Sequence, residues 1–294
     1  MKKLHGITVA MTTPFDGSDN VNYKSIREHV NFLIDRGVDC LYPCGTTGEM
    51  HLMSVDERKK IAETVVNEAA GRVTVFIHAG AMAYRDTVEI SKHAAAIGAD
   101  GVGVVTPCFF SVNEREMAEY YVSVARALPQ DFPVYLYNIP QCAANDLTAE
   151  VAAKIAAEAP NVVGIKYSYL DMVRTRQYLK IRGGDFSVLH GADKFLISLL
   201  PLGIDGTVSG VSSVYPEGFV AALKAYREGN LALAQQEIEK AAQVCDILQN
   251  GRNMAYFKAA MTMRGLDGGH MRRPLLDLMP AEEEKLRKEL QGYF

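Results

Sequence analysis

The segment Val162-Val163-Gly164-Ile165-Lys166 is an apolar, strand-like run that ends in a lysine. An amine with such apolar surroundings is poorly hydrated, which disfavours the ammonium form and leaves a neutral nucleophile. A neutral amine attacks a ketone carbon and forms an imine. Most lysines lie at the surface, however, and by itself Lys166 is equally compatible with a solvated residue that closes a strand.

A second candidate, Tyr137, ends the preceding strand-like run, Val134–Tyr137, just before Asn138-Ile139-Pro140. A phenol beside the amine can hand protons to and from the intermediates of imine formation. Tyr135 and Tyr137 point the same way by strand period, so periodicity does not choose between them. A tyrosine that only packs at the edge of the sheet with a wet hydroxyl is the alternative.

The third candidate is the loop Gly45-Thr46-Thr47-Gly48-Glu49, directly after a short strand-like run. Its two glycines allow a sharp turn, and its consecutive N–H groups and two hydroxyls form a nest suited to a carboxylate. An ordinary turn between a strand and a helix has the same composition. An amine, a proton carrier and an anion nest are together what a 2-oxo acid such as pyruvate requires. No His, Asp or Glu set with metal-ligand spacing offers a metal-dependent alternative.

The elements that must position these residues alternate strictly between short β-rich runs and longer segments of helical period. Such alternation predicts a parallel sheet, and eight units are the number that closes a (β/α)8 TIM barrel, whose catalytic groups lie at the carboxyl ends of the strands. An open doubly wound sheet predicts a glycine-rich phosphate turn after the first strand, where this chain has Met11-Thr12-Thr13-Pro14-Phe15. We therefore expect the barrel. The predicted strands are 7–11, 40–43, 73–79, 101–105, 134–137, 162–166, 187–190 and 206–208.

The helical patterns lie between these strands, and capping signals mark several of their ends. Ser54-Val55-Asp56-Glu57 predicts a capping box at a helix start, and Gly37, Gly71, Gly98 and Gly229 stand where left-handed caps are expected. Three further helical segments, about 230–250, 252–264 and 281–291, follow with no strands between them. We expect residues 1–228 to form the barrel and 229–294 a small helical domain. The eight barrel helices are predicted at 22–36, 54–70, 83–97, 113–127, 148–158, 170–181, 193–201 and 215–228.

The composition excludes several classes of protein. In 294 residues, 48% are hydrophobic and the net charge is −4, with no long basic run of the kind that nucleic-acid binding needs. No stretch reaches the roughly 18 apolar residues of a membrane span, and the first residues are too polar for a signal peptide. Five scattered cysteines form no zinc motif, and an odd number suits reduced thiols. We expect a cytoplasmic protein that binds neither membrane nor nucleic acid.

Several motifs, in order along the chain, are similar to those of a known family. They are Thr13-Pro14-Phe15, Gly45–Glu49, Thr106-Pro107, Tyr137–Pro140, Gly164–Lys166, Gly191 with Asp193, and Arg273–Leu276. In these motifs the chain resembles the dihydrodipicolinate synthase / N-acetylneuraminate lyase family, which are pyruvate-dependent class I aldolases.

The resemblance implies a role for each matching residue. Lys166 would form the Schiff base with pyruvate, and Tyr137 would transfer protons. Thr46 and Thr47, with Gly45, would make the relay and the carboxylate site, and Val208 would line the pyruvate pocket. Gly191 and Asp193 match the region that binds sugar hydroxyls. The resemblance also implies an aldehyde as the second substrate, a homotetramer built as a dimer of dimers, and no dissociable cofactor.

Two positions depart from the family pattern. Phe109 stands where members commonly lend a tyrosine to the neighbouring subunit, and Cys142 stands where dihydrodipicolinate synthases carry a carboxylate-binding arginine. Lys194 and Gly210 depart in turn from the sialic acid lyase pattern. We therefore expect an aldolase or lyase that cleaves or condenses a hydroxylated 2-oxo acid. The alternatives are dihydrodipicolinate synthase proper, N-acetylneuraminate lyase, or a non-catalytic relative that binds an oxo acid.

Overall fold

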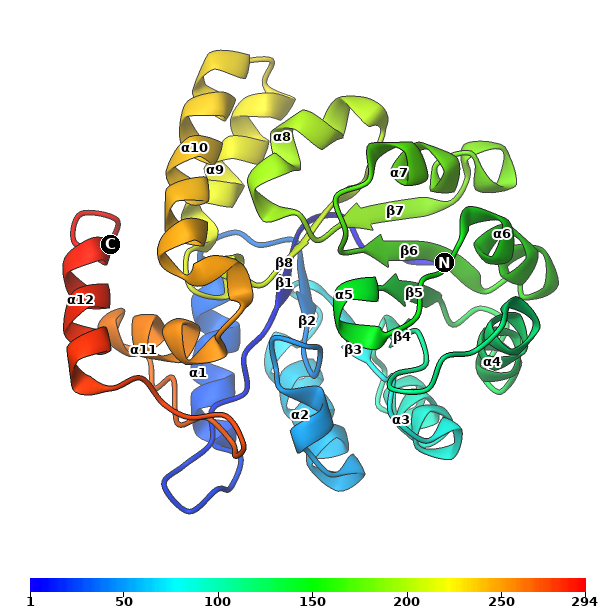
Figure 1. The fold of residues 1–294 in the computed structure, drawn as a ribbon, viewed down its shortest axis with the longest axis horizontal. Helices are drawn as coiled ribbons and strands as arrows, with labels where there is room; N and C mark the ends of the chain where they lie inside the picture. The colour runs from blue at the N-terminus through cyan, green and yellow to red at the C-terminus, as the bar shows by residue number, and fades with distance from the viewer.

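The computed structural model describes all 294 residues and contains a closed barrel of eight parallel strands. Each strand pairs with the next in sequence, and β1 pairs with β8, so that Thr8 lies opposite Val208. The predicted strand order and closure are confirmed (Figure 1). The strands are β1 (Gly6–Ala10), β2 (Cys40–Tyr42), β3 (Thr74–His78), β4 (Gly101–Val105), β5 (Val134–Asn138), β6 (Val162–Tyr167), β7 (Ser187–His190) and β8 (Gly206–Ser209).

Helices surround the strands, as the alternating pattern predicts (Figure 1). The capping box at Ser54 and Glu57 is formed, and the four glycines that were expected at left-handed caps all have φ between 75° and 79°. No helix has the length and apolar character needed to cross a membrane. The helices are α1 (Tyr23–Asp35), α2 (Val55–Ala69), α3 (Tyr84–Ala96), α4 (Glu114–Arg126), α5 (Pro140–Ala143), α6 (Ala149–Glu158), α7 (Met172–Tyr178), α8 (Leu196–Leu199) and α9 (Pro216–Arg227).

The predicted helical segment over 193–201 is present, but only its middle turn is α-helical. The segment consists of a 3₁₀ turn, Asp193–Phe195, the single α-helical turn α8, and a second 3₁₀ turn, Leu200–Leu202. Pro201 lies in the second turn and has no N–H to donate to a helical hydrogen bond, which ends the α-helix early. The shorter connection holds Asp193 close to the end of β7.

Large aromatic residues fill the inside of the barrel, and glycines on neighbouring strands leave room for them. A side chain on Gly103 of β4 would collide with the hydroxyl of Tyr42, and a β-carbon on Gly164 of β6 would lie 2.6 Å from the ring of Tyr135. Such pairing of large and small residues gives a solid interior, so substrates can reach only its ends. Polar residues at the carboxyl ends of the strands therefore lie directly above a closely packed barrel interior.

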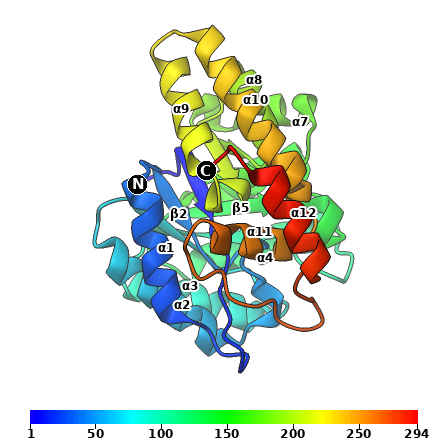
Figure 2. The same ribbon diagram turned by 90° about the vertical axis from the view of Figure 1, so that its left-hand side faces the viewer.

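Three helices follow the barrel: α10 (Leu231–Ile247), α11 (Met254–Met263) and α12 (Pro280–Leu290). Figure 2 shows α11 and α12 on the outer side of the molecule. Their buried apolar residues belong to the same core as those of the barrel helices, and Arg264 at the end of α11 forms an ion pair with Glu217 of α9 at 2.6 Å. The three helices lie where the sequence predicts them. The division into domains at residue 228 stays a prediction.

Candidate active site

Lys166, at the carboxyl end of β6, lies inside the barrel between two aromatic rings. Its residue is 5% exposed, and its Nζ lies 4.1 Å from the ring centroid of Tyr137 and 5.3 Å from that of Tyr42. Tyr137 and Lys166 are direct partners in the β5–β6 register, which is why the amine lies over the phenol. The amine is thus largely removed from bulk water and faces two π systems.

The structure distinguishes the two tyrosines that strand period left equivalent. The Tyr135 hydroxyl accepts a hydrogen bond from the backbone N–H of Leu4, at the amino end of the barrel. The Tyr137 hydroxyl lies 3.2 Å from the Thr46 hydroxyl, at the carboxyl end. A hydroxyl–hydroxyl pair can pass a proton in either direction because each oxygen both donates and accepts. Tyr137 is therefore the phenol that lies beside the amine.

The loop Gly45–Glu49 curls over the carboxyl end of β2. The N–H groups of Gly48 and Glu49 donate to the carbonyls of Gly45 and Thr46 within the turn, whereas those of Thr46 and Thr47 donate no hydrogen bond within the protein. Two adjacent free N–H groups with two hydroxyls form a nest for an anion. The Thr13 hydroxyl donates to the carbonyl of Gly48 and supports the turn from the end of β1.

The remaining predicted site residues border the same mouth from β7 and β8. Val208 packs in the interior cluster that contains Tyr42 and Tyr135. Gly191 has no room for a side chain, because a β-carbon there would collide with the Ser168 hydroxyl.

Asp193 carries the most unusual carboxylate of the mouth. Its Oδ2 accepts a hydrogen bond from the Ser209 hydroxyl at 2.7 Å, and its Oδ1 is buried without a partner. Burial raises the pKa of Asp193 to about 6, against the hydrogen bonds from Ser209 and Val211 and the charge of Lys166. Because burial favours the protonated form, Asp193 can serve as a donor as well as an acceptor toward a ligand hydroxyl.

The two residues that depart from the family pattern are both exposed. Phe109 is 76% exposed, has φ 73°, and stacks edge-to-face on Phe110. Cys142 lies on α5 beside Gln141, whose amide donates to the carbonyl of Ser168 at 2.7 Å. A thiol and an amide in this place give a neutral rim, which offers no cation to a second carboxylate.

The sequence favours His78 as a core histidine at a strand end, and sequence reasoning did not single out Tyr42; both lie next to Tyr137 under the mouth. The His78 ring packs edge-to-face on Tyr42 and on Tyr137, with centroids 5.9 and 5.7 Å away. Burial lowers the pKa of His78 well below its usual range, aided by the charges of Arg58 and Lys166, and burial raises that of Tyr42. Both side chains are thus uncharged and contribute to the site by packing against Tyr137. The position of Tyr42 at the end of β2 was the available signal, by the rule that identified Tyr137.

Other candidate groups take no part in this arrangement. Burial raises the pKa of the Cys44 thiol to about 11, which makes it unreactive. No group of three or more His, Cys, Asp or Glu side chains is placed to hold a metal ion. An amine, a phenol, an anion nest and a buried carboxyl at the carboxyl end of a closed barrel define the class as a (β/α)8-barrel enzyme.

Comparison with known proteins gives the family. The model of the dihydrodipicolinate synthetase family matches residues 3–292. The chain is 35% identical to an uncharacterized DapA-like lyase of Halobacterium salinarum, over 98% of this chain and 93% of that protein. It is 32% identical to 4-hydroxy-tetrahydrodipicolinate synthase of Aquifex aeolicus, over 98% of this chain and 97% of that protein. It is 35% identical to a probable 2-dehydro-3-deoxy-D-pentonate aldolase of Escherichia coli, over 83% of this chain and 81% of that protein.

Solved structures agree with this assignment. The dihydrodipicolinate synthase of Aquifex aeolicus superposes with a TM-score of 0.93 at 32% identity, covering 99% of this chain and 98% of that one. A prophage protein of the same family from Escherichia coli, in complex with pyruvate, gives 0.93 at 30% identity and 99% of both chains. This chain belongs to the dihydrodipicolinate synthetase family. It is a carbon–carbon lyase of the aldolase type.

Proposed function

We propose that the protein binds pyruvate as a Schiff base on Lys166 and uses it to cleave or form a carbon–carbon bond. The observation that carries this proposal is the poorly hydrated amine over the Tyr137 ring, with the Tyr137 hydroxyl in turn beside Thr46. The family relative solved with pyruvate supports the choice of oxo acid. The unpaired N–H groups of Thr46 and Thr47 supply a place for its carboxylate.

In this mechanism the neutral Lys166 amine adds to C2 of pyruvate and gives a carbinolamine. Tyr137 donates a proton to the departing hydroxyl, which leaves as water while the nitrogen lone pair forms the iminium. The Tyr137 oxygen then regains a proton through the Thr46 hydroxyl, which takes one from water as it gives its own. In the cleavage direction the iminium forms instead on C2 of the hydroxylated oxo acid. The C4 hydroxyl then loses its proton to water through the same hydroxyl relay while the electron pair of the C3–C4 bond moves to the iminium, an aldehyde leaves, and the resulting enamine takes up a proton at C3. Hydrolysis of the imine then returns pyruvate and the free amine.

Trapping of the imine tests this function. With pyruvate and borohydride, the wild type is expected to gain the mass of one reduced pyruvate adduct on Lys166, read by peptide mass spectrometry. Lys166→Ala should gain none, while Lys154→Ala, which removes an exposed lysine of α6, should behave as the wild type. Tyr137→Phe should still be trapped, but on the order of 100-fold more slowly, because only proton transfer is lost. Normal turnover by Lys166→Ala would disprove the mechanism.

We further propose that the substrate is a hydroxylated 2-oxo acid, cleaved to pyruvate and an aldehyde. The neutral rim at Gln141 and Cys142 and the buried Asp193 favour hydroxyl groups over a second carboxylate. The pentonate aldolase among the relatives supports this class. Dihydrodipicolinate synthase activity is the second candidate, favoured by the similarity to the Aquifex enzyme.

A substrate panel separates the two candidates. Pyruvate release is measured from 2-dehydro-3-deoxy aldonic acids of five and six carbons and from N-acetylneuraminate, and condensation of pyruvate is measured with aspartate semialdehyde. We expect release from at least one deoxy acid and little condensation. Condensation alone would identify a dihydrodipicolinate synthase. No release from any acid would contradict the cleavage proposal.

We also propose that the protein is a cytoplasmic homotetramer. Large apolar residues are exposed at several places, and two of these patches are Phe109 with Phe110 after β4, and Tyr169, Leu170, Met172 and Val173 around the start of α7. Two apolar patches on one chain suit the two interfaces of a dimer of dimers. The five unpaired cysteines suit a reducing compartment.

A further inference from the structure

The Gly45–Glu49 loop is held in a backbone conformation that it would not adopt unaided. Cys44, just before it, has φ 61°, and Glu49, its last residue, has φ 59° and ψ 39°. Both are non-glycine residues in the left-handed region, which is costly for a residue with a side chain. The loop therefore needs contacts from outside to keep this shape.

Glu49 provides such a contact through a buried ion pair. Its carboxylate Oε1 lies 2.5 Å from the Nζ of Lys258 on α11, and both side chains are at most 2% exposed. The other oxygen, Oε2, accepts a hydrogen bond from the backbone N–H of Arg272 at 3.1 Å. Both oxygens of the carboxylate are thus held by the C-terminal part of the chain.

Lys258 is in turn fixed by other contacts. Its Nζ donates to the carbonyl of His270 at 2.6 Å and lies 4.5 Å from the ring centroid of Phe15. Burial lowers the pKa of Lys258, and the charge of Glu49 acts against this effect. Each member of the pair would be an uncompensated buried charge without the other.

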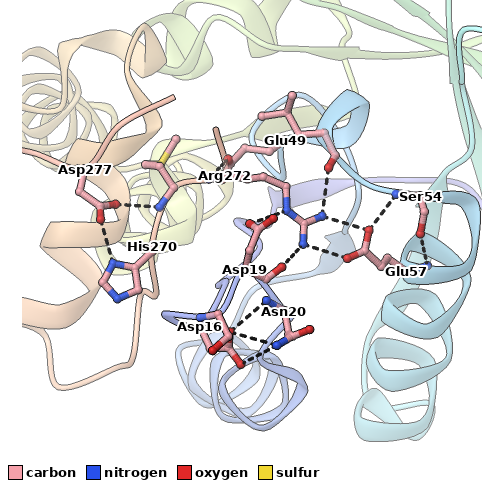
Figure 3. Close-up of polar contacts among 12 residues, drawn as sticks. Asp16, Asp19, Asn20, Glu49, Ser54, Glu57, His270, Arg272 and Asp277 are labelled. Carbon is pink, nitrogen blue, oxygen red and sulfur yellow. Dashed lines mark hydrogen bonds and ion pairs between the residues drawn. The ribbon is translucent and has the colours of Figure 1, made fainter. Parts of the chain in front are cut away.

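Arg272 forms hydrogen bonds with the segment that follows the loop. Figure 3 shows its guanidinium between Asp19 and Glu57, the first-turn glutamate of α2. It donates to Glu57 Oε1 and Oε2 at 2.9 and 3.0 Å and to the carbonyl of Leu52 at 3.0 Å. The segment 49–57 is therefore fastened at both ends to residues 258–272.

We propose that Glu49 is a positioning residue: its ion pair with Lys258 of α11 holds the free N–H groups of Thr46 and Thr47 toward the mouth, where they bind the carboxylate of the oxo acid. The proposal rests on the proposed function of this loop. It makes α11 part of the substrate-binding apparatus although the helix supplies no group that touches substrate. Loss of the pair should weaken pyruvate binding and leave Lys166 and Tyr137 in place.

Glu49→Gln tests this, with Glu217→Gln as the matched control. Glu217 pairs with Arg264 at the end of the same helix but contacts nothing in the loop. The pyruvate concentration for half-maximal borohydride trapping is expected to rise on the order of 10-fold in Glu49→Gln, with maximal trapping near that of the wild type. In Glu217→Gln this pyruvate concentration should stay within about twofold of the wild-type value, even if the melting temperature falls as much as in Glu49→Gln. An unchanged value in Glu49→Gln, or an equal rise in the control, would overturn the proposal.

The double variant Glu49→Gln/Lys258→Met separates positioning from stability. Two neutral side chains of similar length leave no unpaired buried charge, so stability should recover relative to either single variant. Half-saturation by pyruvate should stay raised, because the loop has lost its anchor. If pyruvate binding recovers along with the melting temperature, or if the double variant does not fold, the pair serves the fold alone and the proposal falls.

Hydrogen–deuterium exchange gives a readout that needs no imine. The N–H groups of Gly48, Glu49 and Met50 are bonded within the turn, and they should exchange faster in Glu49→Gln and at the wild-type rate in Glu217→Gln. If wild type is not trapped by pyruvate but exchange responds in this way, only the proposed function fails. If trapping occurs and exchange in the loop is unchanged, only the positioning role fails.

Discussion

Among single residues, the site depends on two ionisable side chains that are largely buried. Lys166 has two aromatic rings near its amine, and Asp193 has one carboxylate oxygen without a partner. Neither arrangement stabilises a fold, because desolvating an ionisable group is costly unless it is paired. Such unpaired groups around one mouth are typical of functional sites.

Asp193 should make stability depend on pH in a direction unusual for an aspartate. Since burial raises its pKa to about 6 from 3.8, the folded protein keeps a proton between about pH 4 and 6 that the unfolded chain has released. Stability therefore falls as pH rises through this window. Asp193→Asn lacks this titration, so its free energy of unfolding should rise relative to wild type by roughly 1 to 3 kcal/mol from pH 4 to pH 7, measured by urea denaturation.

Asp246→Asn is the control with the opposite sign. Its hydrogen bond with Lys194 lowers the pKa of Asp246, so ionised Asp246 stabilises the fold above its unfolded pKa. This variant should lose relative stability as pH rises through the window below about pH 4, by a small amount because Asp246 is exposed, and should change little from pH 4 to pH 7. Parallel trends in the two variants would show that Asp193 is not the group responsible.

At the scale of elements, glycines on the strands determine how the interior packs and where the site begins. Gly164 lies two residues before Lys166 on β6, and the space beside it is filled by Tyr135 and Ser187. The ring of Tyr135 closes the barrel below the amine. A side chain at residue 164 would therefore disturb the floor of the site as well as the core.

Gly164→Ala should destabilise the protein by about 2 kcal/mol or more, since the added methyl group meets the Tyr135 ring and the backbone of Ser187. The measurement is chemical denaturation with a two-state fit. Gly17→Ala is the matched control, because a methyl group at residue 17 meets nothing within 4 Å. Equal stabilities for the two variants would mean that the interior can repack around residue 164.

At the level of the whole molecule, the C-terminal helices support a loop of the barrel, and the exposed apolar residues are expected to contact other copies of the chain. Residues 258–272 hold the Gly45–Glu49 loop from outside. Phe109 and Phe110, after β4, are 76% and 72% exposed, and Val173 on α7 is 70% exposed. Apolar side chains this exposed are unfavourable in a monomer and are expected to be covered by other copies.

Light scattering coupled to size-exclusion chromatography tests the assembly. Wild type should have the mass of four 32.3-kDa chains. Phe109→Asp and Val173→Asp should each reduce it to that of two chains, because a charge is desolvated at a different interface in each. Leu231→Asp, at an exposed apolar residue at the start of α10, should leave four. A monomeric wild type, or no change in either interface variant, would contradict the tetramer.

The eight strand–helix units and most of their ends could be predicted from the residue pattern. The strand–helix alternation and the capping residues are local, and local preferences agree with the final fold in this chain. In the segment 193–201 the helix type was not foreseen: a single α-helical turn lies between two 3₁₀ turns, because Pro201 limits the α-helix. The motifs at strand ends also named Lys166 and the Gly45–Glu49 loop, because in a parallel barrel all carboxyl ends meet at one mouth.

The tertiary structure alone decided what strand period leaves open. It separated Tyr137 from Tyr135 by placing their hydroxyls at opposite ends of the barrel, beside Thr46 and Leu4. It also joined Glu49 to Lys258, which are far apart in sequence and carry no shared motif. A contact between distant residues depends on how whole elements pack, and no local pattern of residue types encodes that packing.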